Sequence, residues 1–316
     1  MVNALNMVWN PSEGIDLGFF VIRFYSLMFV VAFGLGWYIM KAIYNREGQT
    51  VEKLDNLFVY TVVATLIGAR LGHVFFYDWA YFQNHLKEIL LPIRETQSGW
   101  EFTGFTGLAS HGAAIAIILV MYFYSKKVIQ KPILWILDRI VIPVASGAIF
   151  VRLGNFFNSE IIGKETTKDS FLAMKFIKGE EYRGPLGEQA IMAKTNIHDS
   201  QQAFNAVVND PQFKTILDSF PYRYPAQLYE AFGYIFVFAI LFYMYWKTDA
   251  RNKQGLLFGT FLVLLWTVRF FVEFVKGSQG GFEENPLFSA LSTGQWLSIP
   301  FIIAGIYFII RSRKVA

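Results

Sequence analysis

The chain contains no cysteine among its 316 residues. Disulfides, thiolate metal sites and a cysteine nucleophile supplied by this chain are therefore excluded. Charged residues are also scarce, at 16% against about 25% in ordinary soluble domains. Hydrophobic residues make up 54% of the chain, and 33 of them are Phe and 16 are Tyr. This balance indicates a protein whose solvent is lipid.

Other absences narrow the chemistry. The four histidines show no H-E-x-x-H spacing, so we expect no metal, and no Gly-rich loop followed by Lys is present, so we expect no nucleotide or other cofactor. The formal net charge of +4 is small, and a bilayer protein needs basic residues for orientation, so we expect no nucleic-acid partner. Residues 1–17 lack Lys and Arg, so the first apolar run is predicted to be a retained anchor and not a cleaved signal.

Long apolar runs dominate what is present. A bilayer-spanning helix needs about 20 mostly apolar residues. Seven windows qualify: 18–40, 57–77, 106–125, 133–156, 226–246, 255–275 and 295–312. Because unpaired backbone groups are costly in hydrocarbon, each window is expected to be a helix. The predicted fold is an all-α polytopic membrane bundle of about seven transmembrane helices.

Basic residues follow every second span, which predicts the orientation. They are Lys41, Arg46 and Lys53; Lys126, Lys127 and Lys131; Lys247, Arg251 and Lys253; and Arg311, Arg313 and Lys314. The N-terminus is therefore expected outside and the C-terminus in the cytoplasm. Residues 1–163 would hold the first four helices, with an outward loop at 78–106. Residues 164–224 would form a small extracytoplasmic cap, and 225–316 the last three helices.

Ionisable residues recur at one depth, near the outer ends of separate spans. They are Arg23, Arg70, His73, His111, Arg152, Glu230, Arg269 and Glu273. Each charge costs up to about 2.5–3.5 kcal/mol at the bilayer centre and less near an interface. We interpret the shared depth as a water-accessible cavity with a net positive charge, which suits the phosphate of a lipid headgroup. Simpler explanations exist for single residues: Arg23 could snorkel, Arg269 and Glu273 could form a structural pair, and His73 could be a packing residue.

One stretch in this set is specific. The segment R-L-G-N-F-F-N-S-E-I-I-G at 152–163 resembles the signature G-R-x-G-N-F-x-N-x-E-x-x-G of the phosphatidylglycerol–prolipoprotein diacylglyceryl transferases, with Val151 in place of the first glycine. Further similar segments follow in the same order along the chain: I-R-F-Y-S-L-M at 22–28, G-A-R-L-G at 68–72, S-H-G-A at 110–113, Y-P-A-Q-L-Y-E at 224–230, R-F-F-V-E-F at 269–274 and G-Q-W-L-S-I-P at 294–300. The family often has His where Tyr224 stands and Gly where Ala113 stands, and the cap is longer here.

The resemblance implies a reaction in the bacterial cytoplasmic (inner) membrane, with the active site toward the outer leaflet. The sn-1,2-diacylglyceryl group of phosphatidylglycerol would move to the lipobox cysteine of a prolipoprotein, and glycerol phosphate would leave. It assigns Arg152 and Arg269 to phosphate stabilisation and His111 to general base catalysis. Substrate binding would involve Tyr25, Arg152, Asn155, Asn158, Glu160, Gly163 and Glu273. The partners implied are phosphatidylglycerol, lipobox-containing prolipoproteins and membrane lipid.

Three questions stay open at this level. Glu230 or Glu273 could serve as the base in place of His111. The roles of the cap, of Arg23 and of Arg70 are undetermined. An anion or lipid transporter, or a membrane scaffold whose polar residues are structural, would also use buried charges, although a transporter usually shows inverted repeats and broken helices at mid-bilayer.

Overall fold

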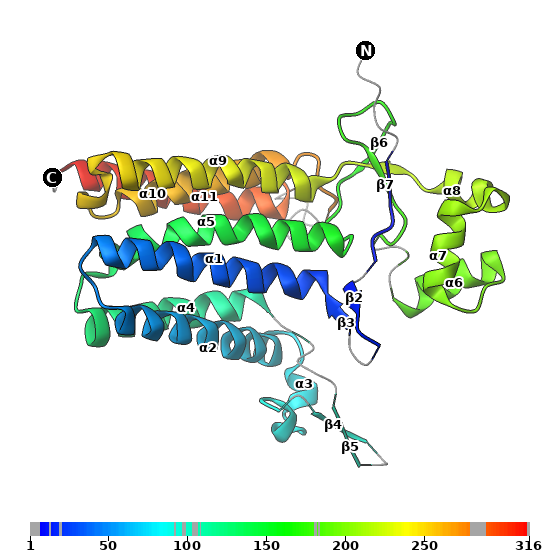
Figure 1. Ribbon diagram of the computed structural model, residues 1–316, viewed down its shortest axis with the longest axis horizontal. Coiled ribbons are helices and arrows are strands. Elements are labelled where there is room, and N and C mark those ends of the chain that lie inside the picture. The colour runs from blue at the N-terminus through cyan, green and yellow to red at the C-terminus, as the bar shows by residue number, and fades with distance from the viewer. Residues whose placement is uncertain are drawn as a thin grey trace. The chain divides into compact units, whose positions relative to one another are not determined.

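The computed structural model describes residues 7–12, 14–18, 21–91, 93–96, 99–102, 107, 109–179, 182, 184–278 and 289–314. Within these, the side chains of residues 94–96, 101–102 and 110–111 lie outside the description. The chain divides into two compact units, one made of Met1–Gly36 with Ile140–Ala316 and the other of Trp37–Arg139. Helices predominate in both units (Figure 1).

Long apolar helices form most of the protein. Within the described ranges, six are long and apolar enough to cross a membrane: α1 (Phe24–Arg46), α2 (Val51–Phe76), the span Gly112–Ile129 formed by α4 (Ser110–Tyr124) and the π-turn η2 (Ser125–Ile129), α5 (Ile133–Phe157), α9 (Ala226–Lys247) and α11 (Thr293–Lys314). The helix α10 (Leu256–Val272) is equally apolar but has 17 residues. A rise of 1.5 Å per residue makes it about 26 Å long, at the short end of what a bilayer needs. The fold is thus that of an all-α, multi-pass membrane protein.

In the unit Trp37–Arg139, helices α2 and α4 pack at very short distance. A Cβ added to Gly112 would lie 2.1 Å from the carbonyl oxygen of Gly68, and one added to Gly72 would lie 2.6 Å from the Cα of Gly112. Small residues at these three positions let the two backbones approach, as in many membrane helix pairs.

The connection after α2 contains short elements. These are α3 (Trp79–Phe82), the 3₁₀ turn η1 (Leu86–Glu88) and a hairpin of β4 (Ile93–Thr96) with β5 (Gly99–Phe102). Arg70 of α2 is 8% exposed, and its Nε and Nη2 donate to the carbonyl oxygens of Ile89 and Glu88 at 2.8 and 2.6 Å. Its guanidinium also lies over the ring of Phe82. Arg70 therefore anchors this connection.

In the other unit, α10 packs against both α9 and α11 (Figure 1). The insert between α5 and α9 forms a cap with its own core. Its helices are α6 (Pro185–Thr195), α7 (Ser200–Asn209), η4 (Pro211–Phe213) and α8 (Lys214–Ser219). Apolar side chains of α6 and α7, such as Ile191, Phe204 and Val207, are buried together. The turn η5 (Asp249–Asn252) joins α9 to α10.

A small sheet ties the cap to the N-terminal segment. Its order is β1-β7-β8-β6, from β1 (Met7–Trp9), β7 (Met174–Phe176), β8 (Tyr222–Arg223) and β6 (Glu165–Thr166), with β1 and β7 parallel. Trp9 stacks on Phe156 of α5 with ring centroids 4.0 Å apart, and its Nε1 donates to the Phe156 carbonyl oxygen at 2.9 Å. The N-terminal strand thus joins the cap to the last turn of α5.

One prediction from the sequence needs correction. The first helix begins at Phe24 and ends at Arg46, whereas the apolar window was 18–40. Residues 21–23 instead form β3 (Val21–Arg23), which pairs with β2 (Gly14–Asp16). A short apolar stretch such as residues 21–23 can form a strand as well as a helix. At the other end, α1 continues through polar residues to Arg46, because helical hydrogen bonds satisfy the backbone groups there.

Candidate active site

The segment 152–163 folds as the last turns of α5 followed by a tight reversal. Arg152 and Asn155 are three residues apart and share a helix face, and Arg152 Nη1 donates to Asn155 Oδ1 at 3.1 Å. Beyond Phe157 the chain turns with Ser159 and Ile161 in the left-handed region, at φ values of 51° and 57°. These residues are not glycine, so the surrounding contacts must hold the turn in place.

The reversal brings Glu160 back onto the helix end. Asn155 Nδ2 donates to Glu160 Oε2 and Asn158 Nδ2 to Glu160 Oε1, both at 3.2 Å. Gln227 of α9 donates to the backbone oxygen of Glu160 at 2.5 Å. The spacing N-x-x-N-x-E therefore builds a continuous series of hydrogen bonds, which runs from Asn158 through Glu160 and Asn155 to Arg152.

Arg152 also makes a buried ion pair. Its Nε lies 2.5 Å from Glu230 Oε2, and the Glu230 side chain is 1% exposed. Tyr234, one helical turn beyond Glu230, donates to Glu230 Oε1 at 3.3 Å. Removing one partner of a buried pair typically costs about 3–5 kcal/mol because the other charge is left without compensation. The guanidinium of Arg152 is therefore held from two helices.

Gly163 allows three segments to meet. Its N–H donates to the carbonyl oxygen of Tyr224 at 2.8 Å, and a Cβ added there would lie 2.5 Å from that oxygen and 2.7 Å from the carbonyl oxygen of Val275. Lys164 N–H donates to Val275 O at 2.8 Å. The end of the signature is thus fixed to the start of α9 and to the end of α10 through backbone groups.

Tyr224, where the family often has His, lies outside the membrane helices in this junction. The hydroxyls of Thr166 and then Ser170 hydrogen-bond to its phenol and lower the pKa of Tyr224 from the usual value near 10.

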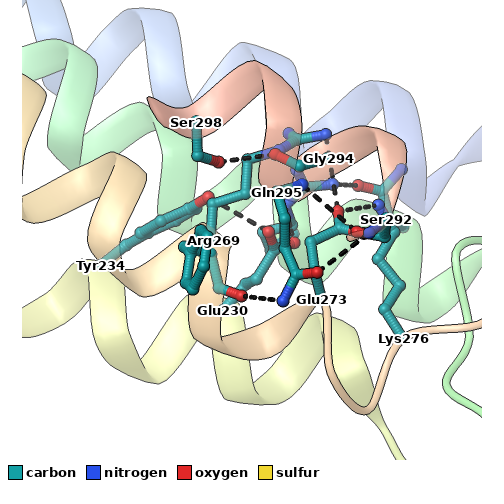
Figure 2. Close-up of polar contacts among 12 residues, drawn as sticks. Glu230, Tyr234, Arg269, Glu273, Lys276, Ser292, Gly294, Gln295 and Ser298 are labelled. Atoms are coloured by element: carbon teal, nitrogen blue, oxygen red, sulfur yellow. Dashed lines mark hydrogen bonds and ion pairs between the residues drawn. The ribbon is translucent and has the colours of Figure 1, made fainter. Parts of the chain in front are cut away.

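At the end of α10, three charged residues gather. Lys276 Nζ lies 2.8 Å from Glu273 Oε1, whereas Arg269 Nη2 lies 3.8 Å from the same oxygen (Figure 2). The Arg269 side chain is 25% exposed and lies over the Trp266 ring. Its Nε is buried and has no hydrogen-bond partner among the residues that the structure describes. Lys276 is thus the closer partner of Glu273, and Arg269 keeps donor capacity.

Arg152 and Arg269 belong to one polar cluster. Tyr234 interacts electrostatically with both arginines, and Glu273 interacts electrostatically with Arg152. The cluster contains the basic residues Arg152, Arg269 and Lys276 and the acidic residues Glu160, Glu230 and Glu273. These six residues carry three positive and three negative charges, because Lys276 and Glu160 also belong to the cluster. The net positive cavity, for which Arg23 and Arg70 were also counted, stays a prediction.

The remaining predicted residues lie as follows. Arg23 is exposed on β3 and lines a cavity of about 230 Å³ with Lys178 and with Asn158, whose side chain donates to Glu160. The Tyr25 ring packs against the backbone of Gly154 in the signature.

His111 belongs to α4, but its side chain lies outside the described part of the chain. His73 stacks on Tyr77, as expected of a packing residue. In the described ranges, no group of three or more His, Cys, Asp or Glu side chains could hold a metal ion.

Several residues of the cluster were missed from the sequence. They are Gln227, Tyr234, Lys276, Ser292 and Gln295. Two local signals were available: Tyr234 follows Glu230 by four residues, and Lys276 follows Glu273 by three, spacings that bring helix side chains together. The contacts from α11 required the tertiary structure.

Known proteins are similar to this chain along almost its whole length. The sequence model of the family described as prolipoprotein diacylglyceryl transferase matches residues 13–311. A phosphatidylglycerol–prolipoprotein diacylglyceryl transferase of Bacteroides fragilis is 35% identical over 306 residues, which cover 96% of this chain and 94% of that protein. One from Chloroherpeton thalassium is 35% identical over 309 residues, covering 98% and 95%. One from Porphyromonas gingivalis is 37% identical over 296 residues, covering 93% and 89%. Since these matches run through the signature at 152–163 and nearly the whole chain, this protein belongs to the prolipoprotein diacylglyceryl transferase family.

Proposed function

We propose that this protein transfers the sn-1,2-diacylglyceryl group of phosphatidylglycerol to the lipobox cysteine of prolipoproteins, the first step of bacterial lipoprotein maturation. The cysteine sulfur forms a thioether bond to the terminal glyceryl carbon. The bond from that carbon to the phosphate oxygen breaks, and glycerol phosphate leaves with the bonding electrons. The thiol proton passes to a base. The absence of cysteine in this chain is compatible with the proposal, because the nucleophile arrives on the substrate.

The observation that carries the proposal is the meeting of the 152–163 signature with the end of α10 in one polar cluster. The departing phosphate gains negative charge, which must be stabilised by donors fixed beforehand. Arg269 meets this need best, because its guanidinium is partly exposed and its Nε is not engaged by any described residue. A guanidinium can donate two parallel hydrogen bonds to a phosphate.

Arg152 has a different role from Arg269, because it is already held by other side chains. Glu230 and Asn155 already occupy its Nε and Nη1, so its position is fixed before substrate arrives. It adds a positive field to the same cluster, where Tyr234 is a further hydrogen-bond partner of its side chain. That field stabilises the charge that develops on the phosphate. Asn155, Asn158 and Glu160 hold this arrangement and would contact the headgroup glycerol. Tyr25 is proposed to contact the headgroup too, and Gly163 acts through the backbone junction.

For the thiol proton we propose His111 as the general base. An imidazole has an ordinary pKa of about 6.5, which suits proton transfer near neutrality. The rivals are carboxylates, and both oxygens of each are occupied. Glu230 accepts from Tyr234 and Arg152, and Glu273 from Ser292 and Lys276. A base must have an oxygen or nitrogen that can approach the thiol, and the occupied oxygens of both carboxylates favour His111 in this role.

We further propose that the protein lies in the bacterial inner membrane with its N-terminus, the cap and the polar cluster toward the outer leaflet, and its C-terminus in the cytoplasm. The alternation of basic connections supports this orientation. Precursors that have crossed the membrane and outer-leaflet phosphatidylglycerol would then reach the same side. Each step of this displacement at carbon is assigned to side chains of the protein and to the two substrates.

The direct test uses the purified protein in detergent with phosphatidylglycerol and a synthetic lipobox peptide. We expect release of glycerol phosphate and a gain in peptide mass equal to one diacylglyceryl group. A peptide with Ser in place of its Cys is the control and should give neither product. Release of glycerol phosphate without peptide modification would indicate a lipase. No release by protein that is folded, as judged by circular dichroism and gel filtration, would contradict the proposal.

A further inference from the structure

The first turn of α11 has a capping arrangement that faces the polar cluster instead of solvent. Ser292 precedes the helix, and its N–H donates to Gln295 Oε1 at 2.9 Å while Gln295 N–H donates to Ser292 Oγ at 3.2 Å. This reciprocal pair is a capping box, a device that normally satisfies free amides at a helix end. Figure 2 shows its residues beside Glu273.

The hydroxyl of Ser292 has a second partner. It donates to Glu273 Oε2 at 3.1 Å, while Glu273 Oε1 receives Lys276 at 2.8 Å and faces Arg269 at 3.8 Å. A serine hydroxyl carries a single proton, and here that proton is directed at the carboxylate. The two oxygens of Glu273 are therefore held from opposite sides, one by α11 and one by α10.

Gln295 fixes the same region through the backbone. Its side chain is 3% exposed, and its Nε2 donates to the carbonyl oxygen of Phe270 at 3.4 Å. At this point α10 tightens, because Phe274 N–H donates to Phe271 O at 3.2 Å. In the tighter turn, the Phe274 N–H no longer bonds to the carbonyl oxygen of Phe270. The side-chain amide of Gln295 donates to that oxygen instead.

Gly294 completes the contact by leaving space. A Cβ added there would lie 2.1 Å from Glu273 Oε1 and 2.2 Å from its carboxyl carbon. Its backbone is helical, so an alanine would suit the helix itself, and the three atoms nearest to its Cβ would all belong to the Glu273 carboxylate. The helix backbone and the carboxylate therefore fit closely.

We propose that Ser292, Gly294 and Gln295 are positioning residues, which orient Glu273 and through it the guanidinium of Arg269. The inference rests on the proposed role of Arg269 in phosphate stabilisation. The cap of α11 is thus a structural part of the phosphate site, although none of its three residues needs to touch the lipid.

The test compares four variants in the glycerol phosphate release assay. Ser292→Ala removes the donor and Ser292→Thr restores a hydroxyl. Gly294→Ala introduces a Cβ against Glu273. Ser298→Ala is the matched control, because the Ser298 hydroxyl donates to the Gly294 carbonyl oxygen within its own helix at 2.6 Å. Circular dichroism and gel filtration in detergent establish that each variant is folded.

We expect Ser292→Ala and Gly294→Ala to lower kcat/KM about tenfold or more, mainly through kcat, with Ser292→Thr and Ser298→Ala near the unchanged protein. Because Gly294→Ala favours the helix, it remains informative if Ser292→Ala fails to fold. The inference is overturned if both alanine variants keep kcat/KM within twofold, if Ser292→Thr is as impaired as Ser292→Ala, or if Ser298→Ala falls equally. Failure of the unchanged protein to release glycerol phosphate would instead refute the proposed function.

Discussion

At the scale of single residues, the two arginines of the cluster are held to different degrees. Arg152 is paired with Glu230 at 2.5 Å and bonded to Asn155, so much of its donor capacity is used in the resting protein. Arg269 faces its carboxylate at 3.8 Å and has an unengaged Nε among the described contacts. The first arrangement favours a fixed field, and the second favours a site that accepts a new anion.

Replacement of Arg269 by Lys tests this distinction. We expect Arg269→Lys to lose most of the transferase activity, by about 100-fold or more, because an ammonium cannot reproduce the planar fork. Insertion into the membrane should be unchanged. The measurement is glycerol phosphate release, with Arg311→Lys at an exposed position as the control. Near-normal transfer by Arg269→Lys would remove the proposed phosphate-binding role.

Replacement of His111 by Gln tests the base. Below its own pKa of about 8.5 a thiol needs a base, whereas above that value it ionises unaided. A neutral imidazole is available above its pKa of about 6.5. We therefore expect His111→Gln to slow transfer most between about pH 6.5 and 8.5, with a smaller loss at higher pH. A pH–rate profile parallel to that of the unchanged protein would point to a carboxylate or to no base at all.

At the scale of helices and strands, hydropathy located the membrane helices, although not every helix end, and was insufficient for their surroundings. The window 133–156 predicted α5 within one residue at its C-terminal end, because lipid allows few alternatives to a helix. The strand β1 was not predicted, since it has three residues and pairs with β7 far along the chain. Short strands of this kind carry little local pattern, and their register is a tertiary property.

The candidate site divides in the same way. Arg152, Asn155 and Glu160 could be predicted because they lie in one short segment with a recognisable spacing. The Ser292 contact could not, because a capping box is a local signal and only the fold shows which carboxylate it faces.

Close packing of α2 on α4 leads to a prediction about stability. In Gly112→Ala, the added methyl would lie 2.1 Å from the Gly68 carbonyl oxygen, so the helices must separate. We expect a loss of about 1–3 kcal/mol in the free energy of unfolding, as for other overpacked contacts. Thermal unfolding in detergent measures it. The control is Gly34→Ala in α1, where an added Cβ meets nothing within 4 Å, and which should be neutral or stabilising. Equal unfolding temperatures for both variants would contradict the packing role.

At the scale of the whole molecule, the orientation in the membrane decides whether the site can work as proposed. The polar cluster, the junction at Gly163 and the cap all follow the same end of α5 along the chain. The connection after α9 carries Lys247, Arg251 and Lys253 and is expected on the opposite, cytoplasmic side. An inverted orientation would place the cluster where secreted precursors do not arrive.

The lack of native cysteine makes this orientation directly measurable, because any introduced thiol is unique. Leu186 in the cap is 85% exposed, and Gln254 lies exposed between α9 and α10. We expect a membrane-impermeant maleimide applied to spheroplasts to label Leu186→Cys and to leave Gln254→Cys unlabelled, with both labelled after the membrane is permeabilised. The two positions differ in charge environment, so labelling of each in the permeabilised sample serves as its own reference for reactivity. The reverse pattern would put the cap in the cytoplasm, and the proposed meeting of Arg269 with an outer-leaflet lipid and a secreted thiol would then be untenable.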